Sequence, residues 1–113
     1  MHEMALAESM LEIVAETARN NGATRVTAIW LELGALANVE ADALKFCFDA
    51  VTRGGMADAA RLTIVESPGR AWCMPCGESV PLSRRGEPCP RCGGYQLSVT
   101  QGDTMRVREI EIA

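Results

Sequence analysis

Four of the five cysteines stand in a C-x2-C-x12-C-x2-C frame, in which two tight turns can close on one metal ion: Cys73, Cys76, Cys89 and Cys92. A glycine follows each pair and gives the backbone the freedom to wrap around the thiolates. Four thiolates suit Zn2+, which accepts a tetrahedron and has no redox chemistry, and a closed shell leaves no open position for a substrate. The frame therefore predicts a structural zinc site.

Two other uses of these cysteines remain open. The same four thiolates can hold one iron ion, as in rubredoxin, which would make the protein an electron carrier. A disulfide framework is disfavoured, because no signal-peptide pattern is recognised and a fifth cysteine, Cys47, is left over. Cys47 falls on the apolar face of an expected helix, where free cysteine acts as a small hydrophobic residue.

The amino terminus offers a second set of metal ligands. The only histidine is His2, and a free α-amine, the imidazole and the first peptide nitrogens can together form a near-planar nitrogen set. Such a set suits Ni(II) or Cu(II) and does not suit zinc. A single histidine near a terminus is a weak signal by itself, so these residues alone do not decide between a metal site and an incidental histidine.

Composition narrows the function classes. The chain has 113 residues, 48% of them hydrophobic, which is typical of one soluble domain, and its net charge is −4. Residues 1–69 hold 5 Lys/Arg against 10 Asp/Glu, and residues 70–113 hold 6 against 5. This acidity disfavours nucleic acid as a partner. No apolar run reaches the roughly 20 residues of a membrane span, so we expect no membrane association and a cytoplasmic protein.

The elements that must position these ligands can be read from periodicity. Residues 3–20 form an expected helix with an apolar stripe opposite exposed glutamates, and a second helix is expected after Asn38, its predicted N-cap, and before Gly54. Strands are expected at 25–33, at 60–66 and within 97–112. The stripe of the first helix is read as Leu6, Met10, Ile13, Val14 and Thr17, and its exposed face as Glu8, Glu12 and Glu16.

This order of elements predicts an α+β fold. Two helices pack on a small three-stranded sheet, and the four-cysteine, zinc-ribbon-like module is inserted between sheet strands. The expected domains are residues 1–68 plus 101–113, and residues 69–100 for the zinc module. Arg84 and Arg85 lie between the two cysteine pairs, where a solvated loop is the default expectation and partner docking the alternative.

The chain resembles the HypA/HybF family of nickel metallochaperones that act in hydrogenase maturation. The resemblance spans nearly the whole length and rests on short motifs in a fixed order. These are Met1-His2-Glu3, residues 25–36, Val39-Glu40, residues 46–49, Trp72-Cys73 with Cys76, Cys89-Pro90-x-Cys92, and residues 110–112.

The resemblance implies a nickel-binding α+β domain that carries a four-cysteine zinc domain, and no catalytic residues. Nickel would bind through the Met1 amine, the His2 imidazole and the backbone nitrogens of His2 and Glu3, with Glu40 as a further candidate. Zn2+ would be structural, at the four cysteines, and Ni2+ would be the transported ion. The implied partners are the large subunit of [NiFe] hydrogenase and a nickel-pathway GTPase, and urease is left open as a further acceptor.

One departure from the family pattern concerns the zinc module. Some relatives place histidines beside the zinc cysteines, whereas Gly77 and Gly93 stand there in this chain. Nickel binding through zinc-module histidines is therefore not expected. The alternatives from other classes are a zinc-ribbon module that binds protein or nucleic acid without nickel, and the rubredoxin-like electron carrier.

Overall fold

The computed structural model describes residues 2–113, and the chain divides into two compact units. The first unit comprises Met1–Glu32, Val39–Val65 and Arg106–Ala113, and the second comprises Leu33–Asn38 and Glu66–Met105. Each unit is built around its own three-stranded sheet. None of the helices formed by residues 2–113 combines the length and the apolar character needed to cross a membrane.

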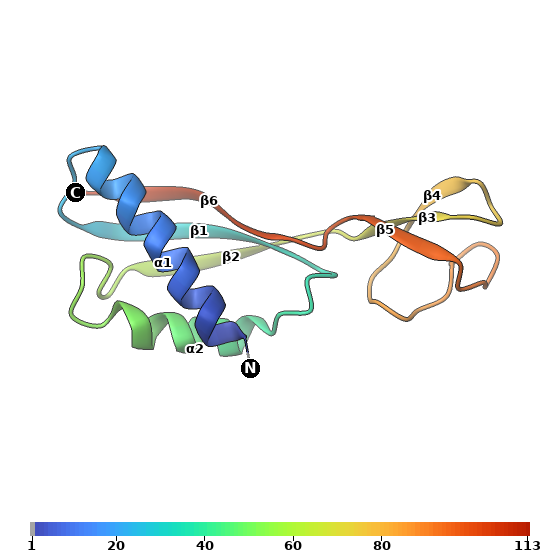
Figure 1. Cartoon of the computed structure of the whole chain (residues 1–113), viewed down its shortest axis with the longest axis horizontal. Helices are drawn as coiled ribbons and strands as arrows, with labels where there is room; N and C mark the ends of the chain where they lie inside the picture. Colours follow the sequence, from blue (N-terminus) through green and yellow to red (C-terminus); the bar gives the residue numbers. More distant parts are fainter. Residues whose placement is uncertain (1) are drawn as a thin grey trace. The chain divides into compact units, whose positions relative to one another are not determined.

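The first unit contains both helices. α1 (Glu3–Asn20) and α2 (Ala41–Thr52) pack against each other, and α1 crosses one face of the sheet (Figure 1). The sheet has the order β2-β1-β6, with β1 (Val26–Gly34) between β2 (Arg61–Ser67) and β6 (Met105–Ile112). The predicted α+β class is confirmed, because the two helices lie on this small sheet and the cysteine module is inserted between β2 and β6.

The buried face of α1 differs from the predicted stripe by part of a turn. Met10 and Val14 are buried as expected, but Ile13 is 55% exposed, and the buried set is completed by Ala7 and Ala18. Alanine has no bulk beyond Cβ, so a helix can approach its neighbour most closely along a face that carries alanines. The predicted exposed face, formed by Glu8, Glu12 and Glu16, is exposed in the structure.

Glu40, and not Asn38, caps the second helix. The Glu40 carboxylate accepts from the backbone N–H groups of Asp42 at 3.3 Å and Ala43 at 3.0 Å. The predicted Asn38 cap is wrong, because Asn38 takes a left-handed conformation with φ of 60° two residues earlier. Asparagine tolerates that conformation better than most residues, so it serves the turn before the helix.

The centre of the first unit is filled by residues of β1 and α2. Ile29 and Leu31 of β1 are fully buried. From α2, Leu44 and Phe48 are buried, and Cys47 lies beside them on the same helix face at 4% exposure. Cys47 therefore packs as a core residue, in agreement with its place on the apolar stripe.

The second unit has a sheet of its own with the order β4-β3-β5. β3 (Arg70–Cys73) pairs antiparallel with β4 (Glu78–Pro81) and with β5 (Leu97–Gln101). A small core of Leu36, Ala71 and Leu82 supports it, and Leu97 and Val99 pack against this core. Leu36 comes from the Leu33–Asn38 segment, so the second unit depends on residues far from the cysteines in sequence.

Three glycines of the second unit allow backbone segments to touch. A Cβ at Gly34 would lie 2.1 Å from the Gly102 carbonyl oxygen, and one at Gly69 would lie 2.4 Å from the Leu82 carbonyl oxygen. A Cβ at Gly102 would lie 2.5 Å from the Pro68 carbonyl oxygen. Real Cβ atoms do not approach backbone this closely, so any side chain at these positions would separate the strands.

Candidate metal centres

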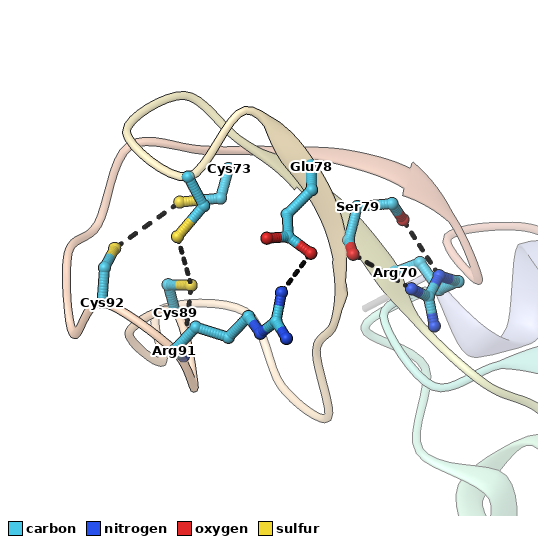
Figure 2. Close-up of polar contacts among 8 residues, drawn as sticks. Arg70, Cys73, Glu78, Ser79, Cys89, Arg91 and Cys92 are labelled. Atoms are coloured by element: carbon cyan, nitrogen blue, oxygen red, sulfur yellow. Dashed lines mark hydrogen bonds and ion pairs between the residues drawn. The ribbon is translucent and has the colours of Figure 1, made fainter.

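The four cysteines of the C-x2-C frame come together in the second unit. Cys73 ends β3, Cys76 lies in the turn between β3 and β4, and Cys89 and Cys92 belong to the loop that precedes β5. Figure 2 shows the Cys73 sulfur facing that of Cys92, with Cys89 close by, and Cys76 completes the group. Residues separated by more than ten positions in the sequence thus supply one cluster of sulfur atoms.

Each cysteine pair sits in a turn that glycine completes. The Gly77 N–H donates to the Cys73 carbonyl and the Gly93 N–H to the Cys89 carbonyl, each at 2.9 Å. Gly77 has a φ of 63° and Gly93 a φ of 74°, a left-handed conformation in which a residue with a side chain is strained. The sequence pattern Cys-Gly therefore marks the points where the chain turns back around the sulfur atoms.

The spacing of the sulfur atoms fits a tetrahedral metal ion. The Sγ atoms of Cys73 and Cys92 are 3.6 Å apart, those of Cys76 and Cys89 are 3.9 Å apart, and all four lie within 4.8 Å of one another. A zinc–sulfur bond of roughly 2.3 Å implies sulfur atoms about 3.8 Å apart at the corners of a tetrahedron. The donor set and its geometry therefore suit Zn2+.

The same distances argue against disulfides. A disulfide requires an S–S bond of about 2.05 Å, and all five cysteines of the described chain are free. Four-sulfur coordination of iron has the same tetrahedral geometry, so the distances alone do not distinguish iron from zinc.

Backbone N–H groups stabilise negative charge on this cluster. The Arg91 N–H donates to the Cys89 sulfur and the Gly94 N–H to the Cys92 sulfur, each at 3.4 Å. Hydrogen bonds from the backbone of Cys92 and Arg91 lower the pKa of Cys89 to about 7. The neighbouring Cys73 thiol and burial raise the pKa of Cys76 to about 12. Cys89 therefore ionises readily, whereas Cys76 resists ionisation. All four cysteines can be thiolates together only when a cation lies among them.

The cluster is covered by apolar and charged neighbours. Cys73, Val80 and Cys89 are buried together, and Leu97 packs against them. Outside this layer, the Arg91 guanidinium pairs with the Glu78 carboxylate and links the second cysteine turn to β4 (Figure 2). Sequence reasoning missed this pair. Its only signal is an arginine inside the second C-P-x-C turn and a glutamate two residues after Cys76.

The predicted amino-terminal nickel ligands are placed only in part. Met1 lies outside the described residues. His2 is the residue before α1, its side chain makes no capping hydrogen bond and is exposed, and its carbonyl accepts the first helical bond from the Leu6 N–H at 2.9 Å. Toward residues 2–113, the imidazole therefore has no capping role at the start of the helix.

Glu3 and Glu40 are brought into contact. The Glu40 N–H donates to the Glu3 carboxylate at 3.4 Å, so the first turn of α1 is tied to the residue that caps α2. Hydrogen bonds from the backbone of Glu3 itself and of Glu40 lower the pKa of the Glu3 carboxyl below its ordinary value of 4.5. The Glu40 carboxylate is engaged as a helix cap, and it would have to leave that cap to bind a metal.

The four cysteines are the one group of His, Cys, Asp and Glu ligands between residues 2 and 113 that is close enough to hold a metal ion. His2, Glu3 and Glu40 do not form such a group among the described residues. A nitrogen set at the amino terminus would draw most of its ligands from the backbone.

The HypA family model, described as "Hydrogenase/urease nickel incorporation, metallochaperone, hypA", matches residues 1–112. A protein called hydrogenase maturation factor HypA from Rhodopseudomonas palustris (strain BisB5) is 56% identical over 112 residues, which cover 99% of each chain. The protein of the same name from Azotobacter vinelandii is 54% identical with the same coverage.

A solved structure of similar fold is the solution structure of the nickel metallochaperone HypA from Helicobacter pylori. It aligns with a TM-score of 0.72 over 99% of this chain and 97% of that chain, at 21% identity, which supports the fold. The family comprises metallochaperones and maturation factors, not enzymes. The match of the family model over residues 1–112 shows that this chain belongs to the HypA family and is a nickel metallochaperone of hydrogenase maturation.

Proposed function

We propose that this protein binds Ni(II) at its amino terminus and delivers it to the large subunit of [NiFe] hydrogenase, acting with a nickel-pathway GTPase. The ligands would be the Met1 amine, the His2 imidazole and the backbone nitrogens of His2 and Glu3, with Glu40 as a further carboxylate. The observation that carries the proposal is the exposed, uncommitted His2 side chain directly before α1.

The start of a helix is a favourable place for ligation by peptide nitrogens. The first N–H groups of a helix have no acceptor in the helical ladder, so their loss to a metal breaks no bond of that ladder, and at Glu3 the hydrogen bond to its own carboxylate would be lost instead. The first helical bond here is donated by Leu6, beyond His2 and Glu3. The helix dipole also stabilises negative charge at this end, which favours deprotonated amide nitrogens. Two such nitrogens would balance the charge of Ni2+.

The four cysteines would hold a structural zinc ion. In this proposal the zinc module comprises residues 69–100, and the nickel-binding domain comprises residues 1–68 and 101–113. A closed shell of four thiolates offers no free position, so the zinc would support the fold while nickel is exchanged elsewhere. The cytoplasm is the proposed compartment, because four metal-binding thiolates must remain reduced.

Extension of the amino terminus tests this site. One or two residues placed before Met1 leave every side chain intact but convert the α-amine into a peptide nitrogen. We expect nickel affinity to fall by orders of magnitude, with zinc content and helicity unchanged. Calorimetric nickel titration of the native-start and extended forms gives the measurement, after mass spectrometry has verified the first residue of each. Equal affinity in both forms would move the nickel site elsewhere in the chain.

A further inference from the structure

Two adjacent arginines of the second unit line a pocket without an acidic residue. Ala35, Leu36, Asn38, Arg84 and Arg85 surround a cavity of about 260 Å³, which we call the arginine pocket. Neither the zinc cluster nor the amino-terminal ligands include any of these five residues. Arg84 and Arg85 lie in the loop between the two cysteine pairs, where the sequence left solvation and partner docking as alternatives.

The pocket is held in shape by contacts on both of its sides. The Arg85 Nε–H donates to the Leu36 carbonyl at 2.9 Å, and the Leu36 side chain packs on Leu82, two residues before Arg84. The backbone around Leu36 is fixed in turn, because the Leu36 N–H donates to the Gly102 carbonyl at 2.7 Å. The arginine-bearing loop closes with a tight turn in which the Glu87 N–H donates to the Arg84 carbonyl at 3.3 Å. These bonds fix the arginine-bearing loop to the backbone around Leu36, whereas a solvated loop would lack such contacts.

The guanidinium groups of this pocket retain free donors. Arginine has five N–H donors, and toward residues 2–113 the Arg85 side chain uses only Nε–H. The Arg84 side chain makes no hydrogen bond or ion pair to any residue from 2 to 113, whereas the side chains of Arg70 and Arg91 in the same unit are bonded to Ser79 and Glu78. Two like charges at one cavity repel each other, and an anion placed between them removes that repulsion.

We propose that the arginine pocket binds carboxylate side chains presented by an acidic segment of a partner protein in the maturation pathway. A carboxylate can accept two parallel N–H bonds from the free edge of a guanidinium, and two adjacent guanidinium groups match two acidic residues. The Asn38 side chain, which also lines the pocket, offers a further amide donor.

Size and charge favour a protein side chain over a phosphate-rich ligand. At about 260 Å³, the cavity is smaller than the roughly 300–1,000 Å³ of pockets that enclose drug-sized ligands. The net charge of the whole chain is −4, so a polyphosphate with its several negative charges would be repelled at long range more than a segment with one or two carboxylates. One or two acidic side chains bring less charge and fill the space.

The test uses the zinc-loaded full chain and a blocked hexapeptide, Gly-Ser-Glu-Glu-Ser-Gly, at low salt. We expect the peptide to shift the NMR signals of the Arg84 and Arg85 side-chain N–H groups and of the Ala35 to Asn38 amides. The same peptide with two glutamines should bind at least about tenfold more weakly, because its charge-assisted hydrogen bonds are lost. Equal shifts from both peptides, or shifts located elsewhere, would overturn the proposal.

Three variants and one competing ligand separate the alternatives. Arg84→Gln leaves the Arg85 bond to Leu36 in place, so it should fold normally and bind the acidic peptide at least about tenfold more weakly, and Arg84→Gln/Arg85→Gln should abolish binding. Arg108 is an exposed arginine of β6, and Arg108→Gln changes the net charge by as much as Arg84→Gln does. This control variant should bind the acidic peptide as the parent does. Inorganic phosphate that shifted the same signals more strongly than the acidic peptide would refute the carboxylate assignment.

A nickel titration of the double variant Arg84→Gln/Arg85→Gln tests whether the arginine pocket acts independently of the terminal nickel site. Neither arginine is a proposed nickel ligand, so nickel affinity should equal that of the parent. Loss of peptide binding with intact nickel binding supports the pocket. Failure of the terminal-extension test would leave the peptide result unaffected.

Discussion

The Glu40 carboxylate caps α2 and is also a candidate nickel ligand. It accepts from the Asp42 and Ala43 N–H groups as the cap of α2, and it lies next to the proposed nickel ligands through the Glu3 contact. A ligand that must first leave a cap binds with an added cost, roughly the free energy of that cap, about 1 kcal/mol. Glu40 is therefore expected to contribute less to nickel affinity than His2, whose imidazole makes no capping hydrogen bond among the described residues.

Substitution at Glu40 can separate these two tasks. Glu40→Asn removes the charge but supplies a good capping side chain, whereas Glu40→Ala removes both. We expect Glu40→Ala to lower the free energy of unfolding by about 1 kcal/mol and Glu40→Asn to stay near the parent. Nickel affinity should fall modestly and equally in both variants, and by far more in His2→Ala. Chemical denaturation and nickel titration give the two readouts, and a Glu40→Asn loss as large as that of His2→Ala would make Glu40 a principal ligand.

The Glu3 carboxylate predicts an acid transition at the start of α1. Its folded pKa is lowered below 4.5 by backbone hydrogen bonds, so its contribution to stability is present above that value and is lost as the pH falls through the lowered folded pKa. The Glu40 amide signal in NMR should therefore titrate with a midpoint below 4.5. In Glu3→Gln the same signal should show no transition of this origin. A midpoint above 4.5 in the parent would contradict the contact.

Among the elements, the long ones could be predicted from sequence and the short ones could not. α1 runs from Glu3 to Asn20 as expected, because its periodicity persists over five turns. β3 and β4 have four residues each and were not expected, since such short strands are defined by their pairing and by the cysteine turns between them. The misplaced Ile13 has a related cause. A helix face that contains alanines gives a weak apolar signal, so the pattern favours the larger neighbouring residue Ile13.

The candidate sites divide in the same way. The four cysteines could be predicted, because two C-x2-C turns carry their geometry in local sequence. The capping role of Glu40 could not, since Asn38 has the stronger intrinsic preference for a cap and only the fold assigns it to the preceding turn. The arginine pocket also depends on contacts between segments far apart in sequence, above all the Arg85 bond to Leu36.

Gly34 of β1 gives a test at the level of strands. A methyl group there would meet the Gly102 carbonyl oxygen at 2.1 Å, and backbone cannot yield as a flexible side chain does. Gly34→Ala should lower the free energy of unfolding by about 3 kcal/mol or more. Gly55→Ala is the matched control, because its added methyl would lie 3.5 Å from the Thr52 carbonyl oxygen, an ordinary contact, and should change stability by about 0.5 kcal/mol or less. Equal unfolding midpoints for the two variants would show that the strands can separate without cost.

At the level of the whole molecule, the zinc site should determine whether the second unit folds. Metal loss removes a folding term on the order of 10 kcal/mol for such sites. Alanine at any one of the four cysteines should therefore reduce bound zinc and unfold the second unit, while both helices, which belong to the first unit, keep much of their signal. Metal analysis and far-ultraviolet circular dichroism provide the measurements. Purified protein that carried redox-active iron, which is red with four thiolates, would instead favour an electron carrier.

The position of Leu36 in the sequence bears on how the cysteine module was inherited. The two cysteine pairs lie within 20 consecutive residues, a segment short enough to pass from gene to gene as one piece. Yet the core under β3 is completed by Leu36, which is encoded before α2 and β2. A transplanted segment would arrive with Ala71 and Leu82 uncovered. The module is therefore expected to be inherited together with the helical unit.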